Sequence, residues 1–379
     1  MKFTLLSRIA VCSLMVSSGF SADGDKGKDQ DGWLELFNGK DLSNWVNVNC
    51  APETWSVEDG VIKCTGKPTG ALRLPKQLEN FVFEVDWRHM KSGGNAGIFV
   101  WGSPVAAPGV PFLRAIEVQV LDHGYNAKGK NEWYTTHGDV FPIHGSSMKP
   151  INKGNGQRCF PSEERSKPSP EWNHYRIEAN NGKLRLSVNG KEVSGGDDCT
   201  WRKGYLGLES EGSPTEWKNL RLKELPSTGA TEEDSAPLDP GWKSLFNGVD
   251  LRDWTASKDK ETAWKGGNWS LRRPDKPAAD DNISRPLPFN SFELIMDWRI
   301  AQEAEPSSPK LSVKDNAGGV HEVDLSATLP EKTNRTGWHR LTLQSSSING
   351  LKAAAPWSLE LQSATAPIEL ANFYIREVK

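Results

Sequence analysis

Long apolar runs are scarce in this chain of 379 residues. The run that stands out, 9–20, follows two basic residues near the N-terminus and is too short to cross a bilayer. Small residues suited to cleavage follow it at Ser21 and Ala22. These features predict a signal peptide over 1–22, a secreted or periplasmic protein, and no membrane span.

Cysteine is also scarce, with five residues in the chain. The residue before Cys12 is valine, where a lipidated cysteine would follow a small residue, so a lipoprotein is not expected. The other four show no CxxC spacing of a zinc or redox site, and in an oxidising compartment they permit two disulfides by any of three pairings. Because Cys50 and Cys64 flank a turn-rich segment, we expect them to pair and to leave Cys159 with Cys199.

An excess of charge of one sign is absent, since 46 basic residues face 49 acidic ones for a net charge of -3. No block of like charge offers a stripe for phosphates or an anionic membrane, so nucleic acid is not an expected partner. Tyrosine is rare, with 5 residues, whereas tryptophan is abundant, with 16. Tryptophan fills cores and also stacks on sugar faces, so the composition is compatible with a carbohydrate partner.

The chain contains an internal repeat. GWLELFNGKDLSNW at 32–45 recurs as GWKSLFNGVDLRDW at 241–254, and later segments recur in the same order, as NFVFEVDWR and SFELIMDWR or EWNHYRI and GWHRLTL. Two copies at a long period indicate duplicated domains rather than a solenoid. Linker-like composition at 227–240 separates a first domain at 31–226 from a shortened second copy at 241–379.

Both halves read as β-structure. Short segments such as FVFEVDW, LRLSVNG and FELIMDW alternate apolar with polar residues and are separated by Gly, Asn and Pro turns. No 12-residue stretch has a helical period. The pattern predicts an all-β protein with two tandem jelly-roll β-sandwich domains.

Alternation along the strands also predicts which side chains leave the core. The polar side chains expected on one exposed face, if their strands are neighbours in one sheet, are Arg88, Glu117, Gln119 and Glu209, with Asn95 and Trp101 beside them. Carboxylates, an amide and a guanidinium beside an aromatic ring would suit sugar hydroxyls. The alternative is an ordinary solvated sheet face.

A long connection distinguishes the first copy from the second. Trp172 follows Glu117 by 55 residues, whereas Trp338 follows Glu322 by 16. Long connections often carry binding residues, and histidine suits acid–base chemistry. The candidates in this connection are Asp122, His123, His137, Asp139 and His144. The three histidines and Asp139 could ligate a divalent metal ion, although their spacing matches no ligand signature, so a metal is an alternative and no cofactor is assigned.

Eight motifs occur in order over about 31–226: LFNGKDLSNW, TWSVEDGVIKCTG, NFVFEVDWR, GGNAGIFVW, IEVQVLD, EWNHYRI, VNGKEV and GYLGLESEG. This set resembles the 3-keto-disaccharide hydrolase family, which is similar in fold to concanavalin A-like lectins and glucanases. The resemblance implies a hydrolase or lyase that acts on oligosaccharides or glycosides oxidised at sugar C3. The ketone acidifies the C2 proton, a base removes it, the C1 group leaves, and water adds to the product.

Roles follow from this resemblance as expectations. Arg88 would stabilise the anion, Glu117 or a loop histidine such as His144 would be the base, and Glu209 would be the acid or bind a hydroxyl. The residues expected to bind substrate are Asn95, Trp101, Gln119, Asp122, His123, His137 and Asp139. The second copy lacks the long connection, and no active site is expected there. The alternatives are a lectin-like glycan-binding protein and a glucanase, although the ExDxxE spacing of such glucanases is absent.

Overall fold

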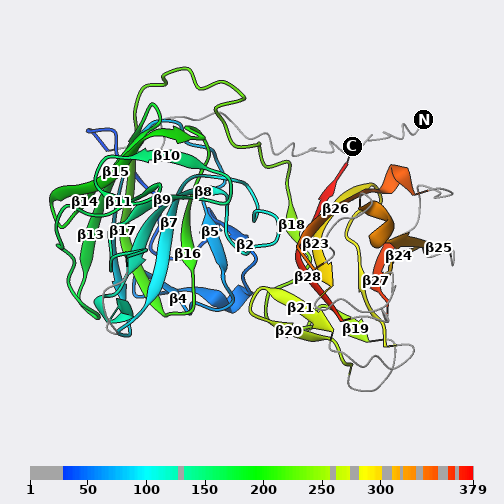
Figure 1. Cartoon of the computed structure of the whole chain (residues 1–379). Helices are drawn as coiled ribbons and strands as arrows, with labels where there is room; N and C mark the ends of the chain where they lie inside the picture. The colour runs from blue at the N-terminus through cyan, green and yellow to red at the C-terminus, as the bar shows by residue number, and fades with distance from the viewer. Residues whose placement is uncertain are drawn as a thin grey trace, which may run out of the picture.

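The computed structural model describes residues 29–126, 132–256, 262–273, 281–300, 310–315, 319–329, 336–348, 357–362 and 367–378. In these ranges the chain forms two β-sandwiches, each built from two antiparallel sheets, which confirms the predicted all-β class (Figure 1). The predicted signal peptide at 1–22 lies outside the described residues. Within them, no helix is long and apolar enough to cross a membrane.

The first sandwich pairs a nine-stranded sheet, here the β6 sheet, with an eight-stranded one, here the β8 sheet. The β6 sheet runs β10-β15-β14-β13-β6-β17-β4-β3, with β1 beside β17. Its strands are β1 (Leu34–Glu35), β3 (Trp55–Glu58), β4 (Val61–Cys64), β6 (Phe81–His89), β10 (Ser147–Pro150), β13 (Asn173–Asn180), β14 (Lys183–Val188), β15 (Lys191–Thr200) and β17 (Thr215–Glu224).

The β8 sheet runs β11-β12-β9-β8-β7-β16-β5-β2. Its strands are β2 (Val46–Val48), β5 (Gly70–Arg73), β7 (Asn95–Gly102), β8 (Ala115–Leu121), β9 (Val140–Ile143), β11 (Gly154–Asn155), β12 (Arg158–Cys159) and β16 (Tyr205–Ser210). Two 3-10 turns, η1 (Pro52–Thr54) and η2 (His123–Asn126), complete the domain.

The second sandwich has a six-stranded sheet, β20-β21-β28-β23-β26 with β18 beside β28, and a five-stranded sheet, β19-β22-β27-β24-β25. The strands of the first are β18 (Lys243–Ser244), β20 (Lys265–Gly267), β21 (Ser270–Arg273), β23 (Phe292–Ile300), β26 (His339–Gln344) and β28 (Ile368–Glu377). Those of the second are β19 (Thr255–Ala256), β22 (Ile283–Pro286), β24 (Lys310–Asp315), β25 (Val320–Asp324) and β27 (Trp357–Leu361), with 3-10 turns η3 (Ser326–Thr328) and η4 (Ser345–Ser347).

Alternating apolar residues of the two facing sheets build each core. In the first domain Phe83 and Val85 of β6 pack in one cluster with Val118 and Val120 of β8, and all four are fully buried. Burial of such a side chain stabilises the fold by roughly 1.5–3 kcal/mol. A separate cluster forms the core of the second domain. The alternation therefore assigned these side chains to the correct face of their strands.

The strands that carry the repeated DWR motif occupy equivalent places. β6 lies between β13 and β17, and β23 lies between β26 and β28. The registers match as well, because Trp87 pairs with Asn173 in the first domain and Trp298 with His339 in the second. The duplication inferred from sequence is thus expressed in the pairing of the strands.

The expected disulfides are absent. Cys50, Cys64, Cys159 and Cys199 all lie in described ranges and all are buried as free thiols. The Sγ of Cys64 accepts a hydrogen bond from the backbone N–H of Gly66 at 3.3 Å. Burial raises the pKa of Cys64 to about 11 and that of Cys199 to about 12, so these thiols serve as small apolar side chains of the core.

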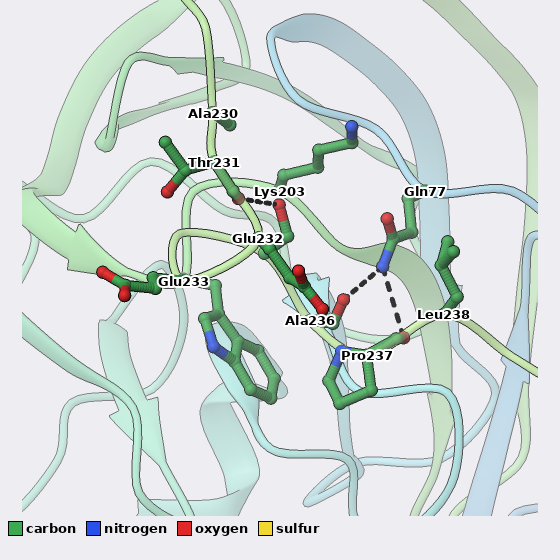
Figure 2. A pocket seen from close by; sticks show the side chains of 11 residues that line it. Gln77, Lys203, Ala230, Thr231, Glu232, Glu233, Ala236, Pro237 and Leu238 are labelled. Carbon is green, nitrogen blue, oxygen red and sulfur yellow. Dashed lines mark hydrogen bonds between the residues drawn. The ribbon is translucent and has the colours of Figure 1, made fainter.

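The segment predicted as a linker is held against the first domain. Asp239 pairs with the buried guanidinium of Arg73, and Tyr205 Oη accepts a hydrogen bond from the N–H of Asp239 at 2.7 Å. Figure 2 shows the side-chain amide of Gln77 donating to the carbonyl oxygens of Ala236 and Pro237, at 2.5 and 3.2 Å. The linker here walls a pocket of about 780 Å³, and none of the described residues that line it is one of the predicted site residues.

The second domain docks on the outer face of the β8 sheet. Ile295 and Tyr374 pack in one cluster with Val48, Ala71 and Phe99 of that sheet, and Figure 1 shows β23 and β28 on the side toward the first domain. The cluster also contains Ala106, Leu113 and Ala115. Part of the sheet face that the strand alternation left outside the core is therefore buried by the second copy.

The buried carboxylate of Asp297 stabilises the contact between the two domains. Asp297 is fully buried and accepts hydrogen bonds from Arg340 Nε at 2.6 Å and from the backbone N–H of Gly109 at 2.8 Å. Asn372 donates to the same carboxylate at 2.6 Å, and its Oδ1 accepts from Asn49 Nδ2 at 2.6 Å. Residues of both domains thus share one buried polar network.

We expect Asp297→Asn to loosen the domain contact, because it leaves the guanidinium of Arg340 without its counter-charge. The loss should be on the order of 3 kcal/mol in the free energy of unfolding. Thermal and urea unfolding should show a lower midpoint, with Asp253→Asn at an exposed position as the control. Equal midpoints for the two variants would contradict this account of the interface.

Candidate active site

The β8 sheet brings four of the predicted polar residues together, namely Asn95, Glu117, Gln119 and Glu209. Gln119 of β8 pairs with Gly97 of β7, and Glu117 pairs with Phe99. On the other side of β7, Gly207 of β16 pairs with Phe99, which places Glu209 beside Gly97. All of these residues lie on the face turned away from the core, because Ile98, Val118 and Leu208 between them belong to the core cluster.

Gly97 makes room for two carboxyl groups. A Cβ at this position would lie 2.7 Å from Glu209 Oε2 and 2.9 Å from Glu117 Oε1. Both glutamates are buried, at 6% exposed for Glu117 and 1% for Glu209, and Glu209 Oε2 has no hydrogen-bond partner. Glycine within a strand often marks such a close approach. The two carboxyl groups therefore occupy the space that a side chain would fill.

A third carboxyl group, Glu211, follows the end of β16 and accepts a hydrogen bond from Asn95 Nδ2. Burial, and then the charge of Glu211, raises the pKa of Glu117 to about 8. Burial, and then the charge of Glu117, raises the pKa of Glu209 well above its usual range. Burial raises the pKa of Glu211 to about 7, against the effect of Asn95. The cluster of Glu117, Glu209 and Glu211, here the carboxyl cluster, thus retains protons near neutral pH.

An amide and a guanidinium border the carboxyl cluster. Gln119 Nε2 donates to Asn95 Oδ1 at 2.9 Å, and Arg158 Nη1 approaches Gln119 Oε1 at 3.4 Å. Arg158 also pairs with Asp139 at 2.8 Å and lies 3.3 Å above the ring of Phe141. Arg158 was not predicted, because it comes from β12, deep in the long connection, and only the fold brings that strand to the sheet.

The structure does not bring Arg88 to this site. Its strand, β6, belongs to the opposite sheet of the sandwich, so its side chain leaves the core on the far side. There Arg88 Nε donates to Glu216 at 2.8 Å and the guanidinium lies 4.5 Å above the ring of Trp172. Alternation gave the correct direction relative to the core, but it could not tell which sheet β6 joins, and the expectation of a shared face was wrong.

Three further predicted residues have structural partners elsewhere. Trp101 is buried and donates from Nε1 to the carbonyl of Glu79 at 2.8 Å, because the register between β7 and β16 shifts near its position. Asp122 accepts from backbone N–H groups, including Gly93 at 2.7 Å and Ser169 at 2.8 Å. His144 stacks on Phe112, with ring centroids 5.7 Å apart, and lines a pocket of about 460 Å³ at the domain contact.

His123 and His137 meet each other instead of the carboxyl cluster. Their ring centroids are 5.7 Å apart, and His123 Nε2 lies 3.0 Å from Glu164 Oε1. The ligating atoms of these three residues all lie within 4.8 Å of one another. Burial, and then the proximity of His123, lowers the pKa of His137 to about 4. The set predicted as metal ligands therefore divides, since Asp139 turns to Arg158 and His144 lies at the domain contact.

The described residues of the second copy hold a different arrangement at the equivalent sheet position. Its Glu322 corresponds to Glu117, and the position of Gly97 is occupied by Lys310, which pairs with Asp324 across the strands. The ammonium group of Lys310 lies 2.7 Å from Glu322 Oε2, and both side chains are half exposed. A cation thus fills the space that holds two buried carboxyl groups in the first domain.

Comparison with known proteins finds one family model and one curated relative that match the first domain. A family model described as the 3-keto-alpha-glucoside-1,2-lyase-like domain matches residues 32–223. A protein of Bacteroides thetaiotaomicron named 3-keto-disaccharide hydrolase is 24% identical over 235 residues, which cover 52% of this chain and 80% of that protein.

The solved structures that are similar to about half of the chain include the following two. One, described as a candidate glycosyl hydrolase from Parabacteroides distasonis, is 23% identical, with a TM-score of 0.41, over 52% of this chain and 95% of that one. The other, a beta-glucanase of Bacillus licheniformis, is 12% identical, with a TM-score of 0.33, over 53% of this chain and 100% of that one.

The raised pKa of Glu117 predicts a pH dependence of stability. An unfolded glutamate loses its proton near pH 4.5, whereas the folded one keeps it to about pH 8, so rising pH destabilises the folded state across this window. Glu117→Gln removes this ionisation. The difference in the free energy of unfolding between the variant and the wild type should therefore shift in favour of the variant by about 2–4 kcal/mol as the pH rises from 5 to 8.5.

Urea unfolding of both proteins at several pH values measures this difference. Glu178→Gln, at an exposed position on β13, is the control and should follow the wild type. A constant difference between Glu117→Gln and the wild type from pH 5 to pH 8.5 would show that Glu117 ionises normally.

Proposed function

The chain belongs, through residues 32–223, to the family of the 3-keto-alpha-glucoside-1,2-lyase-like domain, and we propose that it cleaves 3-keto-glycosides at its carboxyl cluster. The reaction removes the C2 proton of the oxidised sugar, expels the C1 substituent and adds water to the resulting double bond. The observation that carries this proposal is the pair of buried carboxyl groups above Gly97. Burial raises their pKa values, so that these groups remain protonated at neutral pH.

The cluster offers both an acid and a base. Glu211 has the lower raised pKa, about 7, and is less buried than Glu209, so it suits removal of the C2 proton. Glu117 remains protonated to about pH 8 and suits protonation of the departing C1 oxygen. A catalytic acid or base works best when its pKa is near the operating pH. Close carboxyl groups achieve this because they cannot all ionise together.

Arg158 takes the part first expected of Arg88. The C2 carbanion is stabilised as an enolate, with its charge on the C3 oxygen, and a fixed donor nearby lowers the barrier. The guanidinium of Arg158 is held by Asp139 at 2.8 Å and by its contact with Phe141, and its side chain is 20% exposed. A donor that is oriented before substrate arrives needs little reorganisation during the reaction.

Sugar hydroxyls would be bound by the amides that border the cluster. Gln119 Nε2 donates to Asn95 Oδ1 at 2.9 Å and to the carbonyl of Ala96 at 3.1 Å, so the capacity left for a ligand is the second hydrogen of Asn95 Nδ2 and the amide oxygens. The described residues of the second domain form no comparable carboxyl cluster at the equivalent position, where Lys310 pairs with Glu322, but this domain covers the apolar part of the same sheet face around Phe99. We therefore assign catalysis to the first domain and a supporting role to the second.

Steady-state rates on a 3-keto-glucoside test this assignment. Glu117→Gln and Glu211→Gln should each lower turnover about 10²- to 10⁴-fold, the usual loss for a missing acid or base. Arg158→Lys should also lower it strongly, because an ammonium cannot reproduce the planar pair of guanidinium donors. Arg88→Lys is the matched control and should retain the wild-type rate, since Arg88 lies on the opposite sheet.

The same assay separates an enzyme from a glycan-binding protein. Incubation with 3-keto-disaccharides and with unoxidised disaccharides should give cleavage of the oxidised sugar alone. Retention of either sugar without cleavage would favour the lectin-like alternative, and cleavage of the unoxidised sugar would favour a glucanase-type reaction. Wild-type rates in both Glu117→Gln and Glu211→Gln would place the chemistry elsewhere.

A further inference from the structure

A cluster outside the carboxyl site joins three distant segments of the long connection. His123 begins η2 directly after β8, His137 precedes β9, and Glu164 lies between β12 and β13. Their ligating atoms come within 4.8 Å of one another. Two imidazoles and one carboxylate at this separation could contact a single ion without large movement of the backbone.

The present partners of these side chains are weak or exchangeable. His137 Nε2 accepts two long hydrogen bonds, both of 3.3 Å, from the backbone N–H groups of Arg165 and Ser166. His123 Nε2 contacts Ser166 Oγ at 2.6 Å and Glu164 at 3.0 Å. A bound ion would replace these contacts with ligand bonds and would require only the exposed segment around Glu164 to shift.

The surrounding charges permit a cation. Arg165, the nearest basic residue in the sequence, already pairs with Glu163 at 3.0 Å. His137 is 1% exposed, so its imidazole is shielded from water, whereas the side chains of His123 and Glu164 are 29% and 58% exposed and leave a path for an ion. Two nitrogens and one oxygen are the donors typical of zinc and similar transition metals, whereas calcium and magnesium prefer oxygen alone.

We propose that His123, His137 and Glu164 bind a divalent transition-metal ion of the zinc type, with water in the remaining position. The ion would join the start of η2, the segment before β9 and the segment after β12. Asp139, two residues after His137, holds Arg158 at 2.8 Å, so the ion would also brace the wall of the carboxyl site. Binding at these residues is independent of whether the carboxyl cluster cleaves a sugar.

Metal binding to the full protein, purified without a histidine tag and stripped with chelator, tests this directly. Zn²⁺ and Co²⁺ are the probes, and bound metal per chain, the visible spectrum of the Co²⁺ form and Tm are the readouts. We expect one ion per chain, a rise in Tm with Zn²⁺, and little response to Ca²⁺. Glu164→Gln and His123→Gln should weaken binding at least 10- to 100-fold, the loss known for residues that merely support metal ligands.

Both variants alter partly exposed side chains, so neither depends on replacing the buried His137. His174→Gln is the matched control, because His174 bonds Asp86 at 2.8 Å on the β6 sheet and should leave metal affinity unchanged. The proposal is overturned if the wild type binds no Zn²⁺ or Co²⁺ after stripping. It is equally overturned if Glu164→Gln and His123→Gln bind as tightly as His174→Gln, or if Ca²⁺ raises Tm as much as Zn²⁺.

Discussion

The space above Gly97 is the constraint around which the site is built. Because this strand position lacks a Cβ, Glu117 and Glu209 can both turn onto it and lose contact with water. Two buried carboxyl groups so close cannot both be charged at low cost, and their protons are therefore held at pH values where glutamate is normally ionised. Asn95, Gln119 and Arg158 then supply the polar contacts at the border of the cluster.

The second copy has different side chains at the same sheet position. Lys310 occupies the place of Gly97, and its ammonium group neutralises Glu322 at the surface. At this sheet position the carboxyl group of Glu322 is half exposed, and this copy contributes through packing instead. Ile295 and Tyr374 cover apolar residues of the β8 sheet, and Asp297 anchors the contact through Arg340. One sandwich thus carries the carboxyl cluster, and the other packs against the apolar part of the same sheet face.

Local patterns predicted much of the fold and part of the site. Alternation placed Glu117, Gln119 and Glu209 off the core, and the repeat placed the DWR strands in equivalent positions of two sandwiches. The alternation gave wrong predictions where the position of a side chain depends on more than its own strand. Arg88 leaves the core on the opposite sheet, and Trp101 turns inward at a shift in register. The prediction of two disulfides was wrong for a related reason, because the spacing of cysteines in the sequence does not reveal whether two thiols face one another.

The sequence by itself determined the all-β class, the two domains, the family motifs and the direction of side chains along each strand, because these depend on periodicity and order within the chain. The tertiary structure decided which strands share a sheet. It thereby separated Arg88 from Glu117, brought Arg158 beside Gln119, and divided the histidines between the domain contact and the cluster with Glu164. Strand order and burial are long-range properties, and the pKa of a carboxyl group depends on both.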